Sequence, residues 1–191
     1  MNLYRKKAII VGALILFAYA VLASSVIESK TIVMLSETLS GLAVIGIAVI
    51  MFPLFKPYNK NLSVWYFVFR GIEGCLMIIA GFLLLSKNAS FPGIRDAIYV
   101  GHGYIFAVAA LLFYCLLYKS RLIPRFISVW GFIAAILLII VNLLEVMGII
   151  PGSMILYLPI ISNEVVLAVW LIVKGFNPSA LASLPTNTDI D

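Results

Sequence analysis

The chain has 191 residues, of which 64% are hydrophobic and 11% charged, and its mean hydropathy is +1.16. A soluble domain is nearly half apolar and about a quarter charged. The composition therefore excludes a soluble globular protein and predicts one that lies in a lipid bilayer. The formal charge of +5 does not indicate nucleic-acid binding, because the basic residues form short clusters and no continuous stripe.

Six apolar runs are long enough to cross the bilayer as helices, since about 20 residues cover the hydrocarbon core. Charged residues, proline and glycine separate the runs. The fold class predicted is all-α: a polytopic membrane protein with a bundle of six transmembrane helices. One domain is expected over residues 1–176, with a short polar cytoplasmic tail over 177–191. The predicted spans are about 8–27, 32–55, 63–86, 97–118, 126–150 and 154–174.

The distribution of Lys and Arg predicts that both termini face the cytoplasm. With this orientation the outer loops carry three basic residues, Lys30, Lys87 and Arg95. The cytoplasmic segments carry nine: Arg5, Lys6, Lys7, Lys56, Lys60, Lys119, Arg121, Arg125 and Lys174. Trp65, Tyr66, Tyr118 and Tyr58 suit an aromatic belt at the same side. The expected location is the plasma (inner) membrane.

The first span has an alternative interpretation as a cleaved signal peptide. Basic residues 5–7, an apolar run and the small residues before Ser24 match that pattern. Cleavage would leave five spans and would not change the orientation of the rest.

Three segments carry a resemblance to a known family. They are residues 117–131 (LYKSRLIPRFISVWG), residues 163–176 (NEVVLAVWLIVKGF) and Arg70-x-x-Glu73. Together they resemble a bacterial integral membrane family known only as a domain of unknown function, family 4386. The resemblance covers residues 5–178. It implies a multi-span membrane protein and no particular reaction, because the family has none assigned.

Ionisable residues within the spans are the candidate site. Each costs about 2.5–3.5 kcal/mol on insertion scales, so each needs a partner or a wet cavity. Arg70 and Glu73 are i,i+3 and can pair on one helix face, and Gly71 and Gly74 beside them allow another helix to approach closely. Pro159 leaves a carbonyl unsatisfied one turn before Asn163 and Glu164. One cluster between spans two to six is expected, open to the outside: Arg70, Glu73, Asn163, Glu164, Asn142, Glu145, His102 and Glu37.

The sequence leaves three interpretations of this cluster open. It could be structural glue that makes the chain a partner protein without catalytic activity. It could instead bind or translocate a small ligand, ion or lipid. Four carboxylates face one arginine and one histidine, so a bound proton or cation would balance the remaining negative charge. The third option is a metal-assisted intramembrane hydrolase with His102, Glu73, Glu145 and Glu164 as candidate ligands.

The motif inventory weighs against an enzyme. A single histidine excludes the two-histidine zinc helix, and there is no Gly-x-Ser-x-Gly elbow or phosphate-binding loop. No motif in the sequence indicates a particular cofactor. The loop residues Lys119, Arg121 and Arg125 are expected to anchor the topology, with anionic lipid headgroups as an alternative role.

Overall fold

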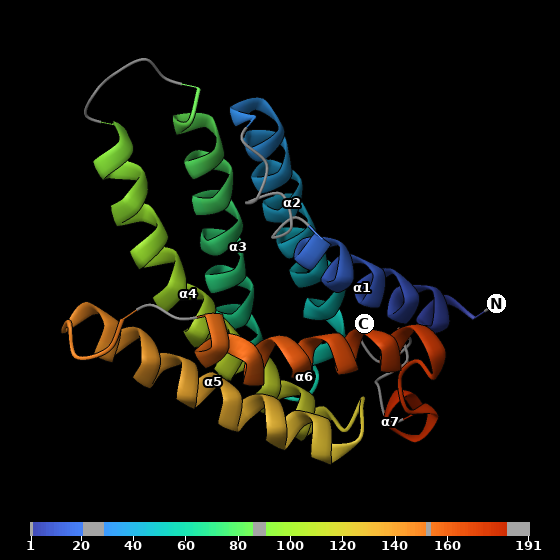
Figure 1. Ribbon diagram of the computed structural model, residues 1–191. Coiled ribbons are helices and arrows are strands. Elements are labelled where there is room, and N and C mark those ends of the chain that lie inside the picture. The colour runs from blue at the N-terminus through green and yellow to red at the C-terminus, as the bar shows by residue number, and fades with distance from the viewer. Residues whose placement is uncertain (1, 21–28, 86–90, 152–153, 183–191) are drawn as a thin grey trace.

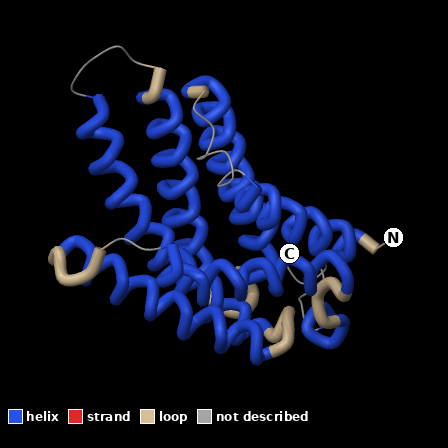
Figure 2. Tube along the Cα trace, viewed as in Figure 1, coloured by secondary structure: helices blue, strands red, loops and turns tan. Residues whose placement is uncertain are grey.

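The computed structural model describes residues 2–20, 29–85, 91–151 and 154–182, and every regular element in those ranges is a helix (Figure 1 and Figure 2). The order is α1 (Leu3–Ala20), α2 (Lys30–Phe55), α3 (Lys60–Leu83), α4 (Phe91–Ser120), α5 (Arg125–Val146), α6 (Met154–Val173) and α7 (Pro178–Ala182).

The helices confirm a polytopic helical membrane protein. Within the described residues, five helices (α2 to α6) are long and apolar enough to cross a membrane. The first predicted span, about 8–27, begins within α1, whose first turn and a half carries the three basic residues at positions 5–7. Residues 21–27 of that span lie outside the described residues, and so does the cleavage site of the alternative signal peptide.

One predicted boundary was wrong, at the start of α4. The outer loop was expected to run to Asp96, but α4 begins at Phe91 and is 30 residues long. Arg95 therefore lies on the helix, where its Nη2 is 2.6 Å from Glu37 Oε1 on α2 and its guanidinium stands 4.6 Å from the Tyr99 ring centroid. These two contacts stabilise a charge that the sequence pattern assigned to a loop.

The six long helices form a closed ring of neighbours. Contacts join α1 to α2, α2 to α3, α3 to α4, α4 to α5, α5 to α6, and α6 back to α1. In Figure 1, α2, α3 and α4 stand side by side, while α1, α5 and α6 run across their lower ends at a steep angle. The ring surrounds a buried core that includes Phe55, Tyr66 and Tyr114.

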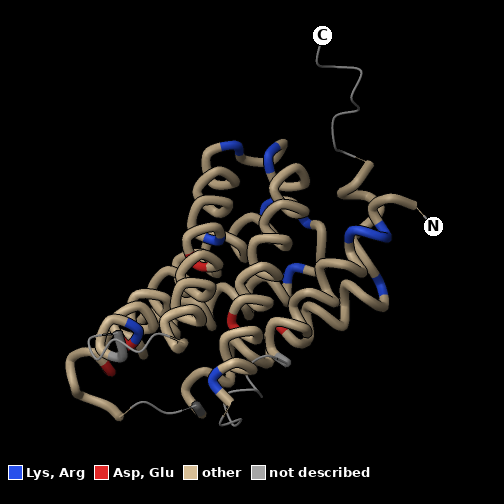
Figure 3. Tube along the Cα trace, turned by 90° about the horizontal axis from the view of Figure 1, so that it is seen from above, with Lys and Arg blue, Asp and Glu red and all other residues tan. Residues whose placement is uncertain are grey.

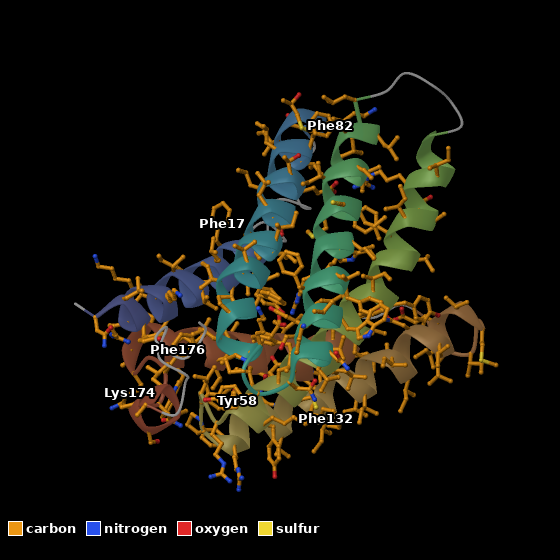
Figure 4. The ribbon with its side chains drawn as sticks, turned by 180° about the vertical axis from the view of Figure 1, so that it is seen from behind. Phe17, Tyr58, Phe82, Phe132, Lys174 and Phe176 are labelled. Carbon is orange, nitrogen blue, oxygen red and sulfur yellow. The ribbon has the colours of Figure 1, made fainter. Side chains whose placement is uncertain are left out.

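The outer surface of the ring is apolar, as a lipid-facing surface must be. Phe17, Phe82 and Phe132 point away from the helices (Figure 4) and are 43%, 55% and 39% exposed. In Figure 3, most Lys and Arg gather over one part of the chain, whereas Asp and Glu lie in the middle and toward the opposite part.

α2 and α3 cross in direct backbone contact at Gly41 and Gly74. A Cβ built on Gly74 would lie 2.6 Å from the Gly41 carbonyl oxygen, and one built on Gly41 would lie 2.5 Å from the Gly74 carbonyl oxygen. The expectation of close approach thus holds for Gly74. It was wrong for Gly71, where an added Cβ would meet nothing within 4 Å.

The first residues of the predicted tail pack against the rest of the chain. The Asn177 backbone N–H donates to Leu122 O at 2.8 Å, and its Nδ2 donates to Arg121 O at 2.8 Å. The short helix α7 follows, and the Tyr58 hydroxyl donates to Ala180 O at 2.8 Å. These bonds hold the α4–α5 loop and the start of the tail together.

Candidate functional site

A cavity of about 700 Å³ lies inside the ring and is lined by residues of all six helices α1 to α6. Its buried end is formed by Arg70, Glu73 and Glu164. Its other end includes Tyr99 and Val146, which are 40% and 61% exposed. Most of the remaining lining is aliphatic or aromatic. Ligand pockets in proteins combine this size with an apolar wall and a few polar groups.

Three charged side chains meet at the buried end of the cavity. Arg70 Nη1 donates to both carboxylate oxygens of Glu73, at 3.0 and 3.1 Å, because the i,i+3 spacing places them on one face of α3. Arg70 Nη2 lies 3.8 Å from Glu164 Oε1 on α6, too far for a hydrogen bond. The Tyr19 hydroxyl of α1 donates to the other Glu164 oxygen. We call Arg70, Glu73 and Glu164 the charged triad.

Aromatic rings surround the guanidinium of the triad. The Arg70 Cζ lies 6.0 Å from the Tyr66 ring centroid, 5.6 Å from that of Phe106 and 5.8 Å from that of Phe113. Such rings attract a cation through their quadrupoles. Arg70 is 6% exposed, so water does little to stabilise its positive charge. One bonded carboxylate, a second nearby carboxylate and these rings stabilise it instead.

A second polar group lies at the other end of the cavity, where α4, α5 and α6 meet. The Tyr157 hydroxyl donates to Glu145 Oε2 at 2.7 Å, and its oxygen also lies 3.2 Å from Asn142 Oδ1, which can only share the same proton. The Tyr104 hydroxyl donates to Asn142 O at 3.0 Å. Glu145 Oε1 and Asn142 Nδ2 are buried and have no hydrogen-bond partner. We call Tyr104, Asn142, Glu145 and Tyr157 the outer subsite.

The other predicted site residues do not join a single cluster. Glu37 bonds to Arg95 and accepts from the Tyr99 hydroxyl, and it does not line the cavity. Asn163 is fully buried, and its Nδ2 donates to Ile127 O at 3.0 Å, which ties α6 to α5. Adjacent residues on a helix point about 100° apart, so Asn163 and Glu164 have different neighbours. Glu37 and Asn163 thus stand outside the cavity, and the other six predicted site residues line it: Arg70, Glu73, His102, Asn142, Glu145 and Glu164.

His102 lines the cavity without joining either polar group. Its ring stacks on Phe106, with centroids 6.4 Å apart and an interplanar angle of 3°, and its buried Nε2 has no partner. Among the described residues, no group of three His, Cys, Asp or Glu side chains could hold a metal ion. The four candidate metal ligands are instead divided between the triad, the outer subsite and His102.

Tyrosine hydroxyls are the functional groups that sequence reasoning missed. Tyr19, Tyr99, Tyr104 and Tyr157 each bond to a candidate residue or to its backbone. A buried tyrosine hydroxyl needs a partner, so tyrosines in apolar runs were the available signal. Tyr66, expected in an aromatic belt, is 0% exposed and packs against Phe55.

The basic loop between α4 and α5 lies away from the cavity. Lys119, Arg121 and Arg125 are exposed, and the Arg125 guanidinium stands 5.1 Å from the Tyr118 ring centroid. Arg121 adopts a positive φ of 54°, and its carbonyl accepts the bond from Asn177.

The helix α6 continues through Pro159, where Ser162 Oγ donates to Leu158 O at 2.6 Å.

Comparison with known proteins places the chain in a family. The model of a domain of unknown function, DUF4386, matches residues 8–175. The chain belongs to this family. The match begins within α1 and includes all of α2 to α6, so this DUF4386 protein is a multi-pass helical membrane protein.

The chain is also similar to a curated protein. The chain is 28% identical over 141 residues to an uncharacterized protein of Archaeoglobus fulgidus. The aligned region covers 74% of this chain and 82% of the relative. No solved structure matches the chain.

Proposed function

We propose that residues 1–176 act as one transmembrane domain that binds a small ligand in the cavity, as a binding or translocating protein. The observation that supports this most strongly is the combination of an apolar cavity of about 700 Å³ with polar groups at both ends. A network of polar contacts that only joins helices needs no empty space between its side chains. Here space exists beside a buried carboxylate oxygen and an amide nitrogen that lack partners.

The structural role that competes with this proposal accounts for part of the polar set. The Glu37–Arg95 pair and the Asn163–Ile127 bond join neighbouring helices and stand outside the cavity. The charged triad differs from these, because Glu164 lies at more than hydrogen-bond distance from Arg70 and lines the cavity. A ligand that reaches the triad would meet this carboxylate directly.

The basic loop supports a location in the plasma membrane. With the predicted orientation, Lys119, Arg121 and Arg125 face the inner leaflet, whose anionic headgroups attract such clusters by about 1 kcal/mol per basic residue. We infer that these three residues contact lipid headgroups there and take no part in the cavity.

Narrowing the cavity should weaken binding. Ala18 lines the cavity on α1, whereas Ala13 on the same helix is exposed. We expect at least one compact adamantane compound (1-adamantylammonium, 1-adamantanol or 1-adamantanecarboxylate) to raise the melting temperature of the purified parent protein and of Ala13→Trp. The Ala18→Trp variant should show a smaller shift, because the indole takes up part of the space that the compound needs. If none of the three compounds stabilises the parent, the proposal fails.

A further inference from the structure

Among the described residues that line the cavity, the carboxylate of the outer subsite differs from the other two in having no cation beside it. Glu73 and Glu164 face Arg70, and outside the cavity Glu37 faces Arg95. No Lys or Arg nitrogen of the described residues lies within 4.0 Å of the Glu145 carboxylate. Its Oε2 accepts from Tyr157, while its buried Oε1 has no partner. A carboxylate at this depth needs a partner, and the described part of the chain supplies only a neutral hydroxyl.

The neighbours of Glu145 are fixed in place by hydrogen bonds. The Tyr104 hydroxyl donates to the Asn142 carbonyl, and the Tyr157 hydroxyl donates to the Glu145 carboxylate one turn further along α5, so two tyrosines are tied to this stretch of the helix. All four residues line the cavity. Aromatic rings next to a carboxylate favour a cation through their π faces as well as through charge. Asn142 is 7% exposed and its Nδ2 has no partner, so its N–H groups remain available at the same end of the cavity.

The wall next to the outer subsite is apolar. Leu138, Ile160 and Ile161 line the cavity beside it and continue toward the charged triad. A ligand whose polar group sits at Glu145 would therefore place an uncharged body along these side chains. At the buried end of the cavity, Arg70 is already paired with Glu73, so no anionic ligand is needed there to balance its charge.

From this arrangement we propose that the ligand is a lipophilic ammonium ion: an apolar body with one protonated nitrogen, whose N–H donates to Glu145 Oε1. This assignment rests on the proposed function, since it names the chemical class bound in the same cavity. Asn142 Nδ2 would donate to an acceptor oxygen near that nitrogen where the ligand has one. Removal of the negative charge should weaken binding by about 10- to 100-fold, as loss of a charge-assisted hydrogen bond does.

The test compares three adamantane compounds that differ only in their polar group. In the detergent-solubilised parent protein, 1-adamantylammonium should bind more tightly than 1-adamantanol, and 1-adamantanecarboxylate most weakly. Glu145→Gln should raise the Kd of the ammonium compound by about 10- to 100-fold and leave that of the alcohol nearly unchanged. Tyr157→Phe keeps the ring and should weaken ammonium binding less. Glu37→Gln, the same change outside the cavity, should have no effect.

The outcomes separate this inference from the proposed function. Tighter binding of the carboxylate or the alcohol than of the ammonium would overturn the ammonium assignment and leave a ligand cavity in place. Equal loss of ammonium binding in Glu145→Gln and Glu37→Gln would overturn it as well, because the effect would not belong to the outer subsite. Absence of binding by all three compounds would remove the proposed function itself.

Discussion

Arg70→Ala should destabilise the folded protein by about 3–5 kcal/mol, the usual cost of removing one partner of a buried ion pair. The substitution leaves Glu73, which is 2% exposed, and Glu164, which is 7% exposed, without their cation. It also removes the group that Phe106 and Phe113 surround. The free energy of unfolding in mixed micelles, titrated with a denaturing detergent, measures the effect.

Second substitutions identify the main partner of Arg70. Because Glu73 lies at 3.0 Å and Glu164 at 3.8 Å, Glu73→Gln should restore more stability to the Arg70→Ala protein than Glu164→Gln does. Arg95→Ala serves as the control, since the Arg95 side chain is 23% exposed and its loss should cost less. If Arg70→Ala unfolds like the parent, the charged triad does not hold the helices together.

Gly74→Leu should destabilise the protein by about 3 kcal/mol, the upper end of the usual range for overpacking. A side chain at this position would meet the Gly41 carbonyl oxygen, at 2.6 Å from its Cβ, and the backbone of α2 cannot rotate away as a side chain can. The two helices must then separate along their length. Detergent-induced unfolding and the yield of folded protein both report this loss.

Gly71→Leu provides a matched control one turn away on the same helix. An added Cβ there meets nothing within 4 Å, so this variant should be as stable as the parent. Equal destabilisation by Gly74→Leu and Gly71→Leu would show that leucine at either position harms α3 for a reason other than contact with α2.

The fold was predictable wherever its cause was local. Continuous apolar length decides whether a segment spans a bilayer, and α2, α3, α5 and α6 begin and end within a few residues of the predicted spans. The start of α4 was not predictable in this way, because the partner of Arg95 is Glu37, 58 residues earlier in the chain.

The same distinction explains the candidate site. The Arg70–Glu73 pair follows from an i,i+3 spacing on one helix and was predicted. The bonds from Tyr19 to Glu164 and from Tyr157 to Glu145 join different helices, and spacing within one helix carries no information about them. Gly71 and Gly74 were also indistinguishable in sequence, since only the position of α2 decides which of them meets another backbone.

Access to the cavity from outside the cell tests the central claim most directly. Ser40 is 2% exposed and lines the cavity on α2, whereas its neighbour Leu39 is 47% exposed on the outer surface of the ring. In a protein with Cys75→Ala and Cys115→Ala, Ser40→Cys should react with a membrane-impermeant, positively charged thiosulfonate reagent added outside. The adamantane compound that binds best should slow this reaction, and Leu39→Cys should not react. A Ser40→Cys protein that stays unreactive, or that reacts at the same rate with the compound present, would contradict a ligand cavity open to the outside.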